Sequence, residues 1–268
     1  MSTATAVLCD RIACRFPTSL GESYTAIKNV SLVVDEGRFV TLVGPTGCGK
    51  STLLNAVAGL LSPSEGTIEI FGQPLKGLNR DAAYLFQQDG LLPWKTALEN
   101  VALGLLFLGL QRREALTEAA HWLHTVGLAG FEDRYPHQLS GGMRKRVAIA
   151  QCWAVNPRIL LMDEPFSALD VQTRQLMETE LLSLWAGSEK TVLFVTHDLD
   201  EAIALADEVL VLSAGPAARV IGSYTVDLPR PRNVAEIRLE PRFVEIYRDI
   251  WEQLRGEVVR AHGRERGA

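Results

Sequence analysis

A glycine-rich segment at residues 44–51, GPTGCGKS, constrains the fold more than any other part of this sequence. It matches the pattern G-x-x-x-x-G-K-[ST] at every fixed position. The apolar run Phe39–Val43 precedes it, and the helix-forming sequence STLLNAVAG follows and ends at Gly59. A strand, such a loop and a helix in this order form a site where backbone N–H groups surround phosphate oxygens. The sequence therefore predicts a phosphate-binding loop, and a glycine-rich turn that matches by chance is the weaker alternative.

Different groups of the loop are expected to bind ATP and Mg²⁺. Backbone N–H groups of residues 47–51 would surround the phosphates, the Lys50 ammonium would reach the β and γ oxygens, and the Ser51 hydroxyl would ligate Mg²⁺. We expect a thiol alkylator to modify Cys48 and block ATP binding; the alternative is a small side chain without chemistry. The predicted nucleotide-binding residues of the loop are Gly44, Pro45, Thr46, Gly47, Cys48, Gly49, Lys50, Ser51 and Thr52.

Three further apolar runs resemble the one before the loop. They are AAYLF at 82–86, ILLM at 159–162 and TVLFVT at 191–196. The last two are short and do not alternate with polar residues, which is typical of parallel strands buried on both faces. Ligands of open α/β sheets bind at the carboxyl ends of the strands. The polar residues that follow these runs are therefore expected to share one site.

Those strand ends supply the candidate catalytic residues. Asp163 would hold Mg²⁺ directly or through a water, and Glu164 would be the general base that polarises the attacking water. His197 is expected to contact the γ-phosphate, and the Gln87 amide to bind Mg²⁺ or the water. The alternatives are ordinary ones: a solvated acidic turn, a structural histidine and a surface glutamine.

The remaining segments complete an α/β prediction. Residues 6–9 and 31–35 resemble short strands, and GTIEIFG alternates as an antiparallel strand does, with Ile68 and Ile70 inward. We expect a P-loop NTPase core with a mostly parallel sheet, an N-terminal antiparallel β subdomain and a helical insert. The predicted organisation is an ATPase domain over residues 1–230, a helical subdomain inserted at about 94–155, and a helical tail over 231–268 with a mobile charged end.

Composition narrows the class of partners. The net charge of −5 argues against a nucleic-acid binder, which usually carries a basic excess. The four cysteines form no C-x-x-C pair, so reduced thiols in a cytosol are expected. The N-terminus lacks the apolar core of a signal peptide. The longest apolar run, Val101–Leu110, is shorter than the about 20 residues of a membrane-spanning helix, so we expect a buried helix there.

The segment LSGGMRKRVAIAQ, residues 139–151, predicts an anion site at a helix start. Ser140 can cap the first turn, and the two glycines after it leave the backbone accessible. The free N–H groups and partial positive charge of a helix start favour phosphate. Arg144, Lys145 and Arg146 are expected to form a solvated face, with added potential near a phosphate as the alternative. His121 and His124 lack an apparent third metal ligand, so a solvated helix face is expected for them too.

Taken in order, the motifs resemble the ATP-binding subunit of ABC transporters over about residues 5–255. They are GPTGCGKS, YLFQQ, LSGGM, LLMDEP, SALD at 167–170 and THD with His197. The resemblance implies a homodimer that holds two ATP molecules head to tail between its subunits. Ser140, Gly141 and Gly142 would then bind the γ-phosphate in the partner's site, and Asp170 would lie at the dimer interface.

The resemblance also implies an aromatic side chain that stacks on adenine. By spacing from the N-terminus, Phe16 is the candidate and Tyr24 is the second choice. Either could instead be a core aromatic. Phe16 would stack but lacks the hydroxyl of the tyrosine that the family usually has.

Finer features are similar to importers of nitrate, sulfonate and taurine. They are LLPWKTALENV, GMRKR and VDLPRPR; Gln151 and Lys145 depart from this pattern, standing where arginine and glutamine are common. The resemblance implies transmembrane permease subunits as partners, a solute-binding protein that acts indirectly, no nucleic acid, and a peripheral position on the cytoplasmic face of the inner membrane. LLPW at 91–94 would receive a coupling helix of the membrane subunit or be buried within the insert.

A soluble, non-transport ABC ATPase acting in translation or DNA repair is the alternative function. Such proteins usually carry two nucleotide domains, a long coiled coil or zinc-binding cysteines. Each motif occurs once here, and Lys50 and Asp163 are too close in sequence for a long coiled coil between them. The sequence therefore favours an ATP-hydrolysing subunit of an importer.

Overall fold

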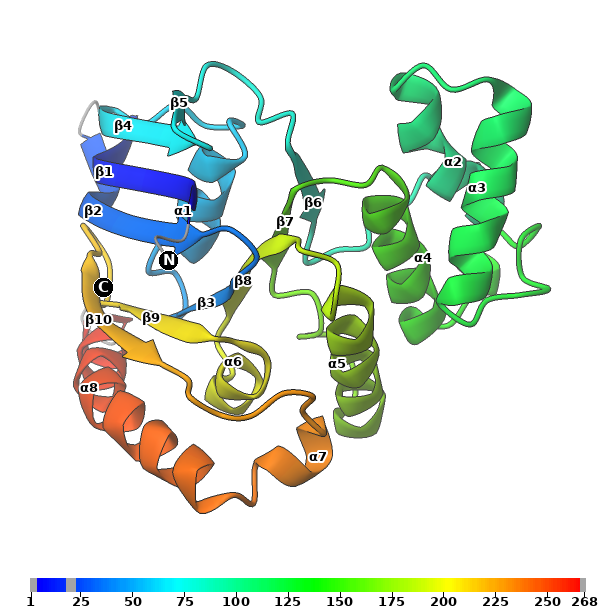
Figure 1. Ribbon diagram of the computed structural model, residues 1–268. Coiled ribbons are helices and arrows are strands. Elements are labelled where there is room, and N and C mark those ends of the chain that lie inside the picture. The colour runs from blue at the N-terminus through cyan, green and yellow to red at the C-terminus, as the bar shows by residue number, and fades with distance from the viewer. Residues whose placement is uncertain (1–3, 18–22, 266–268) are drawn as a thin grey trace.

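The computed structural model describes residues 4–17 and 23–265, with side chains as far as Ala261. Two sheets organise it (Figure 1). The first is antiparallel, with strand order β2-β1-β4-β5; its strands are β1 (Thr5–Pro17), β2 (Ser23–Asp35), β4 (Glu65–Ile70) and β5 (Gln73–Pro74). The second has the order β10-β9-β3-β8-β7-β6; its strands are β3 (Phe39–Val43), β6 (Ala82–Leu85), β7 (Ile159–Asp163), β8 (Thr191–Thr196), β9 (Glu208–Leu212) and β10 (Val220–Thr225).

The second sheet is parallel except at β10, and it separates two apolar cores. In β3, Phe39 and Val43 enter one core while Val40 and Leu42 enter the other. Strands β7 and β8 alternate in the same way. Burial on both faces explains why these strands lack polar alternation, and it confirms the prediction of a mostly parallel core.

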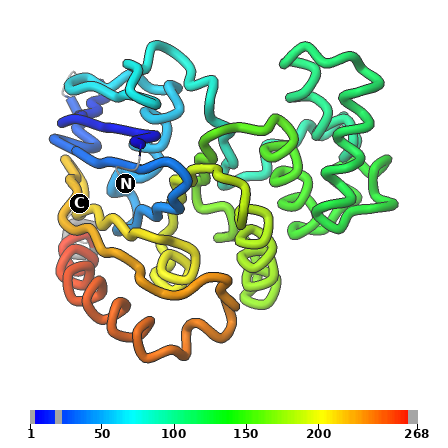
Figure 2. Tube along the Cα trace, in the orientation of Figure 1, coloured from blue at the N-terminus to red at the C-terminus, as the bar shows by residue number. Residues whose placement is uncertain are grey.

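Helices cover both faces of this sheet. Helix α1 (Lys50–Val57) packs between the two sheets, against β2, β7 and β8. Helices α2–α4 pack on one another and extend away from the antiparallel sheet, while α8 packs on α6 and β10 (Figures 1 and 2). These helices are α2 (Ala97–Phe107), α3 (Arg112–Thr125), η1 (Pro136–Gln138, a 3₁₀ turn), α4 (Gly141–Ala154), α5 (Val171–Trp185), α6 (Leu199–Leu205), α7 (Val234–Ile237) and α8 (Pro241–Glu265).

Two local predictions need correction. Strands β1 and β2 are 13 residues each rather than short, because they form one long hairpin with irregular register. The run Val101–Leu110 is a buried helix only in its first part: Val101, Ala102 and Leu105 are buried, but α2 ends at Phe107, which is 83 % exposed, and Leu108 is also exposed. Helix α8 continues into the charged end as far as Glu265, and residues 266–268 lie outside the described residues. The mobility of this end stays a prediction.

Candidate functional site

The carboxyl ends of four parallel strands meet at one edge of the second sheet. Val43 in β3 pairs with Thr196 in β8, and Asp163 in β7 pairs with Val195 in β8. On the other side of β7, Leu85 in β6 pairs with Met162. Because the strands end level with one another, the residues that follow them are brought to the same edge, as expected of an α/β ligand site.

The phosphate loop leads into α1 through a left-handed glycine. Gly49 is the residue before α1, with φ of 102°, and a Cβ atom there would lie 2.7 Å from Cγ2 of Ile27. Both the conformation and the space exclude larger side chains. No side chain caps α1, so its first N–H groups stay available to an anion.

Lys50 is held over this loop. Its side chain is buried, and Nζ donates hydrogen bonds to the carbonyl oxygens of Gly44 (3.0 Å) and Pro45 (3.2 Å). The same Nζ lies 3.6 Å from Oε1 of Glu164. The ammonium is therefore fixed at the point where the loop and the acidic strand end meet.

Ser51 and Asp163 form a pair of oxygen donors suited to Mg²⁺. The Ser51 hydroxyl donates to Oδ1 of Asp163 at 2.9 Å. Burial raises the pKa of Asp163, whereas the hydrogen bonds from Ser51 and Tyr84 lower it. A hydroxyl beside a partly desolvated carboxylate fits a hard divalent cation, which would favour the ionised acid. The residues present therefore fit the expected Mg²⁺.

Tyr84 was not anticipated from the sequence. Its hydroxyl donates to Oδ2 of Asp163 at 3.3 Å, and burial raises the pKa of this tyrosine, with Asp163 adding to the effect. The available signal was one hydroxyl in an otherwise apolar strand, AAYLF. The pairing of Tyr84 with Leu161 places it beside the end of β7, which only the strand register reveals.

Glu164 and His197 contact each other directly. Nδ1 of His197 lies 2.9 Å from Oε2 of Glu164, so the carboxylate stands between the imidazole and Lys50. Glu164 has φ of 43°, a conformation that costs free energy for a residue with a Cβ atom. Its backbone N–H donates to the Val195 carbonyl at 2.9 Å, which helps to hold this geometry.

Gln87 is connected to Glu164 through one intervening side chain, that of Ser167. Its Nε2 donates to Oγ of Ser167 at 3.4 Å, and that hydroxyl donates to the Glu164 carbonyl at 2.9 Å. No hydrogen bond joins Gln87 to Ser51 or Asp163 within the described residues. A role for Gln87 in binding Mg²⁺ or water therefore remains a prediction. Ser167 is a contact that sequence spacing did not reveal.

The LSGGM segment begins a helix as expected, next to the SALD segment. Ser140 precedes α4 and its Oγ accepts from the Met143 N–H at 3.2 Å. A Cβ atom on Gly142 would lie 3.1 Å from Cγ2 of Thr173. Asp170 caps α5 by accepting from the Thr173 N–H at 3.0 Å. In the part of the chain that the structure describes, no hydrogen bond joins residues 140–142 to the phosphate loop.

Arg174 is a second contact that the sequence analysis missed. Its Nη1 lies 3.0 Å from Oδ2 of Asp198, and its Nη2 donates to the Leu169 carbonyl at 3.2 Å. Asp198 directly follows His197, and Leu169 belongs to SALD. One guanidinium therefore joins the segment after β8 to the segment before α5.

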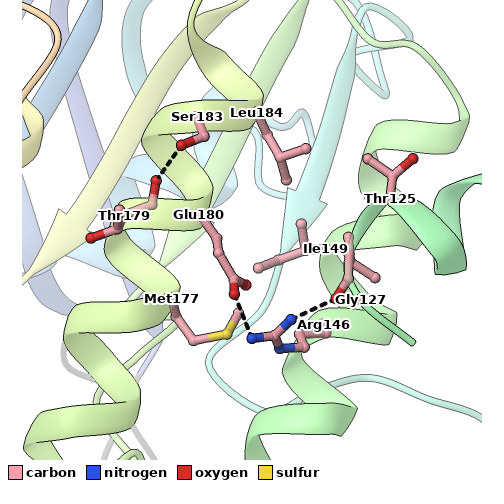
Figure 3. A pocket seen from close by; sticks show the side chains of 10 residues that line it. Thr125, Gly127, Arg146, Ile149, Met177, Thr179, Glu180, Ser183 and Leu184 are labelled. Atoms are coloured by element: carbon pink, nitrogen blue, oxygen red, sulfur yellow. Dashed lines mark hydrogen bonds and ion pairs between the residues drawn. The ribbon is translucent and has the colours of Figure 1, made fainter. Parts of the chain in front are cut away.

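The predicted solvated face at residues 144–146 is wrong. Arg144 and Lys145 both pair with Asp89, and Arg146 pairs with Glu180 of α5. Arg146 also donates to the Val126 carbonyl at 2.7 Å. It lines a cavity of about 320 Å³ between α4 and α5, with apolar walls that include Ile149, Met177 and Leu184 (Figure 3). These cations attach α4 to the rest of the chain.

The expectation of an accessible Cys48 thiol is also contradicted. Cys48 is fully buried in the core beneath the phosphate loop, and burial raises its thiol pKa. Alkylation requires an exposed thiolate. All four cysteines are free and buried, as small apolar side chains would be.

Phe16 and Tyr24 face each other across the hairpin of β1 and β2, so both adenine candidates lie together. Phe16 is half-buried against the core, whereas Tyr24 is exposed. The Tyr24 hydroxyl is 3.9 Å from the Cβ position of Gly215, which in turn is 3.2 Å from the Gly47 carbonyl. Tyr24 therefore lies near the phosphate loop, and Phe16 is its partner across the strand pair; the adenine contact stays a prediction for both.

The described residues show neither a cluster of metal ligands nor a helix that could cross a membrane. The described residues contain no group of three or more His, Cys, Asp or Glu side chains arranged to hold a metal ion. His121 instead lies edge-on to the Trp122 ring. None of the helices within residues 4–17 and 23–265 is both long and apolar enough to span a bilayer.

Known proteins match this chain over most of its length. A family model described as ABC transporter matches residues 27–167. An uncharacterised ABC transporter ATP-binding protein of Methanocaldococcus jannaschii is 46 % identical over 90 % of this chain and 88 % of its own. The taurine import ATP-binding protein of Rhizobium johnstonii is 43 % identical, covering 90 % and 93 %, and the nitrate import ATP-binding protein of a Synechocystis species is 42 % identical, covering 87 % and 90 %.

A solved structure supports the same assignment. A dimeric ATP-binding cassette in a post-hydrolysis state, bound to ADP and Pi, superimposes with a TM-score of 0.74 and 34 % sequence identity. The match covers 83 % of this chain and all of the other. With a phosphate loop, an acidic strand end and a serine-capped LSGGM helix in one fold, this chain belongs to the ABC transporter family, as an ATP-hydrolysing ATP-binding subunit.

Proposed function

We propose that this subunit drives the import of a small solute of the nitrate, sulfonate or taurine class through partner membrane subunits. The observation that carries the proposal is the similarity to taurine and nitrate import proteins over 87–90 % of the chain. Two copies would bind two ATP molecules head to tail on the cytoplasmic face of the inner membrane. A solute-binding protein would act on the membrane subunits and never contact this chain.

The chain's own residues would share the hydrolysis step. Mg²⁺ would be held by Ser51 and Asp163, with Gln87 as a further ligand, and when bound it supplies positive charge against the phosphates. Lys50 would neutralise charge on the β and γ oxygens. Glu164 would accept a proton from the attacking water, with its carboxylate oriented by His197.

The partner copy would complete each site. Ser140, Gly141 and Gly142 make no hydrogen bond to the phosphate loop of their own chain. Their position at the exposed start of α4 leaves them available to the γ-phosphate bound by a second copy. ATP would thus close the dimer and hydrolysis would reopen it, which would move the membrane subunits.

The docking of membrane subunits is supported by the LLPW segment. Trp94 is 69 % exposed. The alternative that this tryptophan is buried within the helical insert therefore does not hold. A large exposed aromatic fits a surface that a protein partner covers. A short helix of the membrane subunit is therefore the proposed occupant of the surface around Trp94.

The experiment is a reconstitution with membrane subunits and a solute-binding protein of a taurine or nitrate importer from the same organism. ATPase activity in proteoliposomes should rise several-fold with taurine, an alkanesulfonate or nitrate, and Trp94→Ala should abolish the rise but keep basal ATPase activity. Leu176→Ala, at an equally exposed leucine on α5, is the matched control. Failure to associate with any membrane subunit, with stimulation by ribosomes or DNA instead, would support the non-transport alternative.

A further inference from the structure

Lys145 is a buried cation whose contacts all lie in one loop. It sits in the second turn of α4 with a side chain only 3 % exposed. Its Nζ donates to the carbonyl oxygens of Phe86 (3.3 Å) and Gln87 (3.1 Å), and it lies 3.0 Å from Oδ1 of Asp89. An ammonium has three N–H donors, and here each has an acceptor. The loop that carries Gln87 is thus fastened to α4.

Asp89 extends this connection to the start of α4. Its Oδ2 accepts from Nε of Arg144 at 3.1 Å, so two successive cations use both carboxylate oxygens. Nη1 of Arg144 donates in turn to the Leu139 carbonyl at 2.8 Å, directly before Ser140. A continuous chain of charge-assisted hydrogen bonds therefore runs from the Gln87 carbonyl to the Leu139 carbonyl, directly before the residue that caps α4.

A lysine at position 145 can hold the Gln87 loop better than a glutamine or a methionine could. A glutamine at this position would offer two N–H donors and no charge, so one of the three acceptors would lose its partner. A methionine would leave the carbonyls of Phe86 and Gln87 without this donor and Asp89 with Arg144 as its remaining cation, which is costly. The burial shows that Lys145 serves the loop and not the solvent.

We infer that Lys145, with Asp89 and Arg144, clamps the Gln87 loop to the LSGGM helix so that Gln87 and residues 140–142 move as one body. Gln87 would serve the ATP site of its own chain, while residues 140–142 would serve the partner's site. The clamp would therefore couple the two ATP sites of a dimer. Lys145 is a positioning residue, and the inference rests on the proposed role of Gln87.

The test compares the purified full-length chain with Lys145→Met, Asp89→Asn, the double variant and Gln87→Ala. Lys145→Met should lower kcat about tenfold, because a small displacement of a ligand is enough for such a loss. It should raise the Mg²⁺ concentration needed for half-maximal rate, and leave ATP binding unchanged, since Lys50 and the phosphate loop are untouched. The double variant should be no worse than the more impaired single variant, because both remove the same link.

A matched control separates positioning from stability. Lys190 is also buried, and its Nζ donates to Oδ1 of Asn156 (2.6 Å) and the Pro157 carbonyl (3.0 Å), without contact to the Gln87 loop. Lys190→Met should lower the melting temperature but leave kcat and the Mg²⁺ dependence of the remaining folded protein as in the wild type.

Each remaining outcome decides between the hypotheses. A Lys145→Met protein with wild-type kcat and Mg²⁺ dependence, beside an impaired Gln87→Ala protein, would overturn the clamp alone. A Gln87→Ala protein with full activity would instead refute the proposed role of Gln87 and the clamp's function with it. Additive losses in the double variant would show that Lys145 and Asp89 act separately.

Discussion

Glu164, the proposed general base, is held in an unusual conformation. Its backbone adopts a left-handed conformation, and its carboxylate is fixed between Lys50 and His197. Strain of this kind persists only where the surrounding structure enforces it, and it is concentrated at functional sites. The sequence LLMDEP was enough to predict that Glu164 is a candidate base. Its contact with His197 could not be predicted from the sequence, because it depends on how β7 and β8 pair.

Replacing Glu164 with glutamine should keep the site's shape and remove the base. We expect kcat of Glu164→Gln to fall at least about 100-fold, the lower range for loss of a general base. ATP should still bind, because Lys50 and the loop are intact. A steady-state ATPase assay beside a nucleotide-binding assay checks both parts, and hydrolysis at the wild-type rate would require another water-activating group.

Tyr84 is one of the groups that affect the pKa of Asp163. The Tyr84 hydrogen bond lowers the pKa of Asp163, against burial, which raises it. Only ionised Asp163 would hold Mg²⁺, so activity is present above this pKa and lost as pH falls through it. Tyr84→Phe should therefore move the acid limb of the kcat–pH profile to higher pH. Tyr135→Phe, at an exposed site, is the control and should not move it.

Helices α5 and α6 each carry a buried acid, Glu178 and Glu201, and burial raises the pKa of both. Glu201 in α6 is almost fully buried, its Oε1 has no hydrogen-bond partner, and burial raises its pKa to about 8. The folded state then binds a proton that the unfolded state has released, between the ordinary value of 4.5 and about 8. The contribution of Glu201 to the free energy of unfolding therefore falls as pH rises from 4.5 to about 8.

Glu201→Gln should remove this loss. At pH 8 the variant should be more stable than the wild type by at least ~1 kcal/mol, and at pH 4.5 the two should be similar. Urea unfolding at both pH values measures the difference. Glu114→Gln, at an exposed position in α3, should change neither. Equal stability of wild type and Glu201→Gln at pH 8 would show that this carboxyl ionises without cost.

At the scale of elements, the pattern of apolar residues predicted the buried strands but not the length of the hairpin strands or the exposed end of α2. Strands β3, β7 and β8 were recognisable because both faces are buried. The length of β1 and β2 was not, since their hairpin is irregular in register. The exposed end of α2 looked buried because a run of leucines and phenylalanine carries no sign of which face meets a partner. The contacts of Lys145 depend on tertiary packing, which a local charge pattern does not encode.

At the scale of the whole molecule, the site is divided between surfaces. The phosphate loop, the acidic strand end and His197 share one edge of the sheet, whereas the LSGGM helix start lies beside α5. If the proposed function holds, a monomer would carry two incomplete halves, and head-to-tail pairing would join them. The solved cassette, which is similar over 83 % of this chain, is dimeric.

The most direct test measures the mass of Glu164→Gln in solution with and without ATP, by light scattering during size-exclusion chromatography. We predict a monomer without ATP and a dimer with it, and we expect that adding Ser140→Arg abolishes the dimer while ATP binding persists. A Glu164→Gln, Ser140→Arg protein that still dimerises with ATP would contradict the placement of the LSGGM helix in the partner's site.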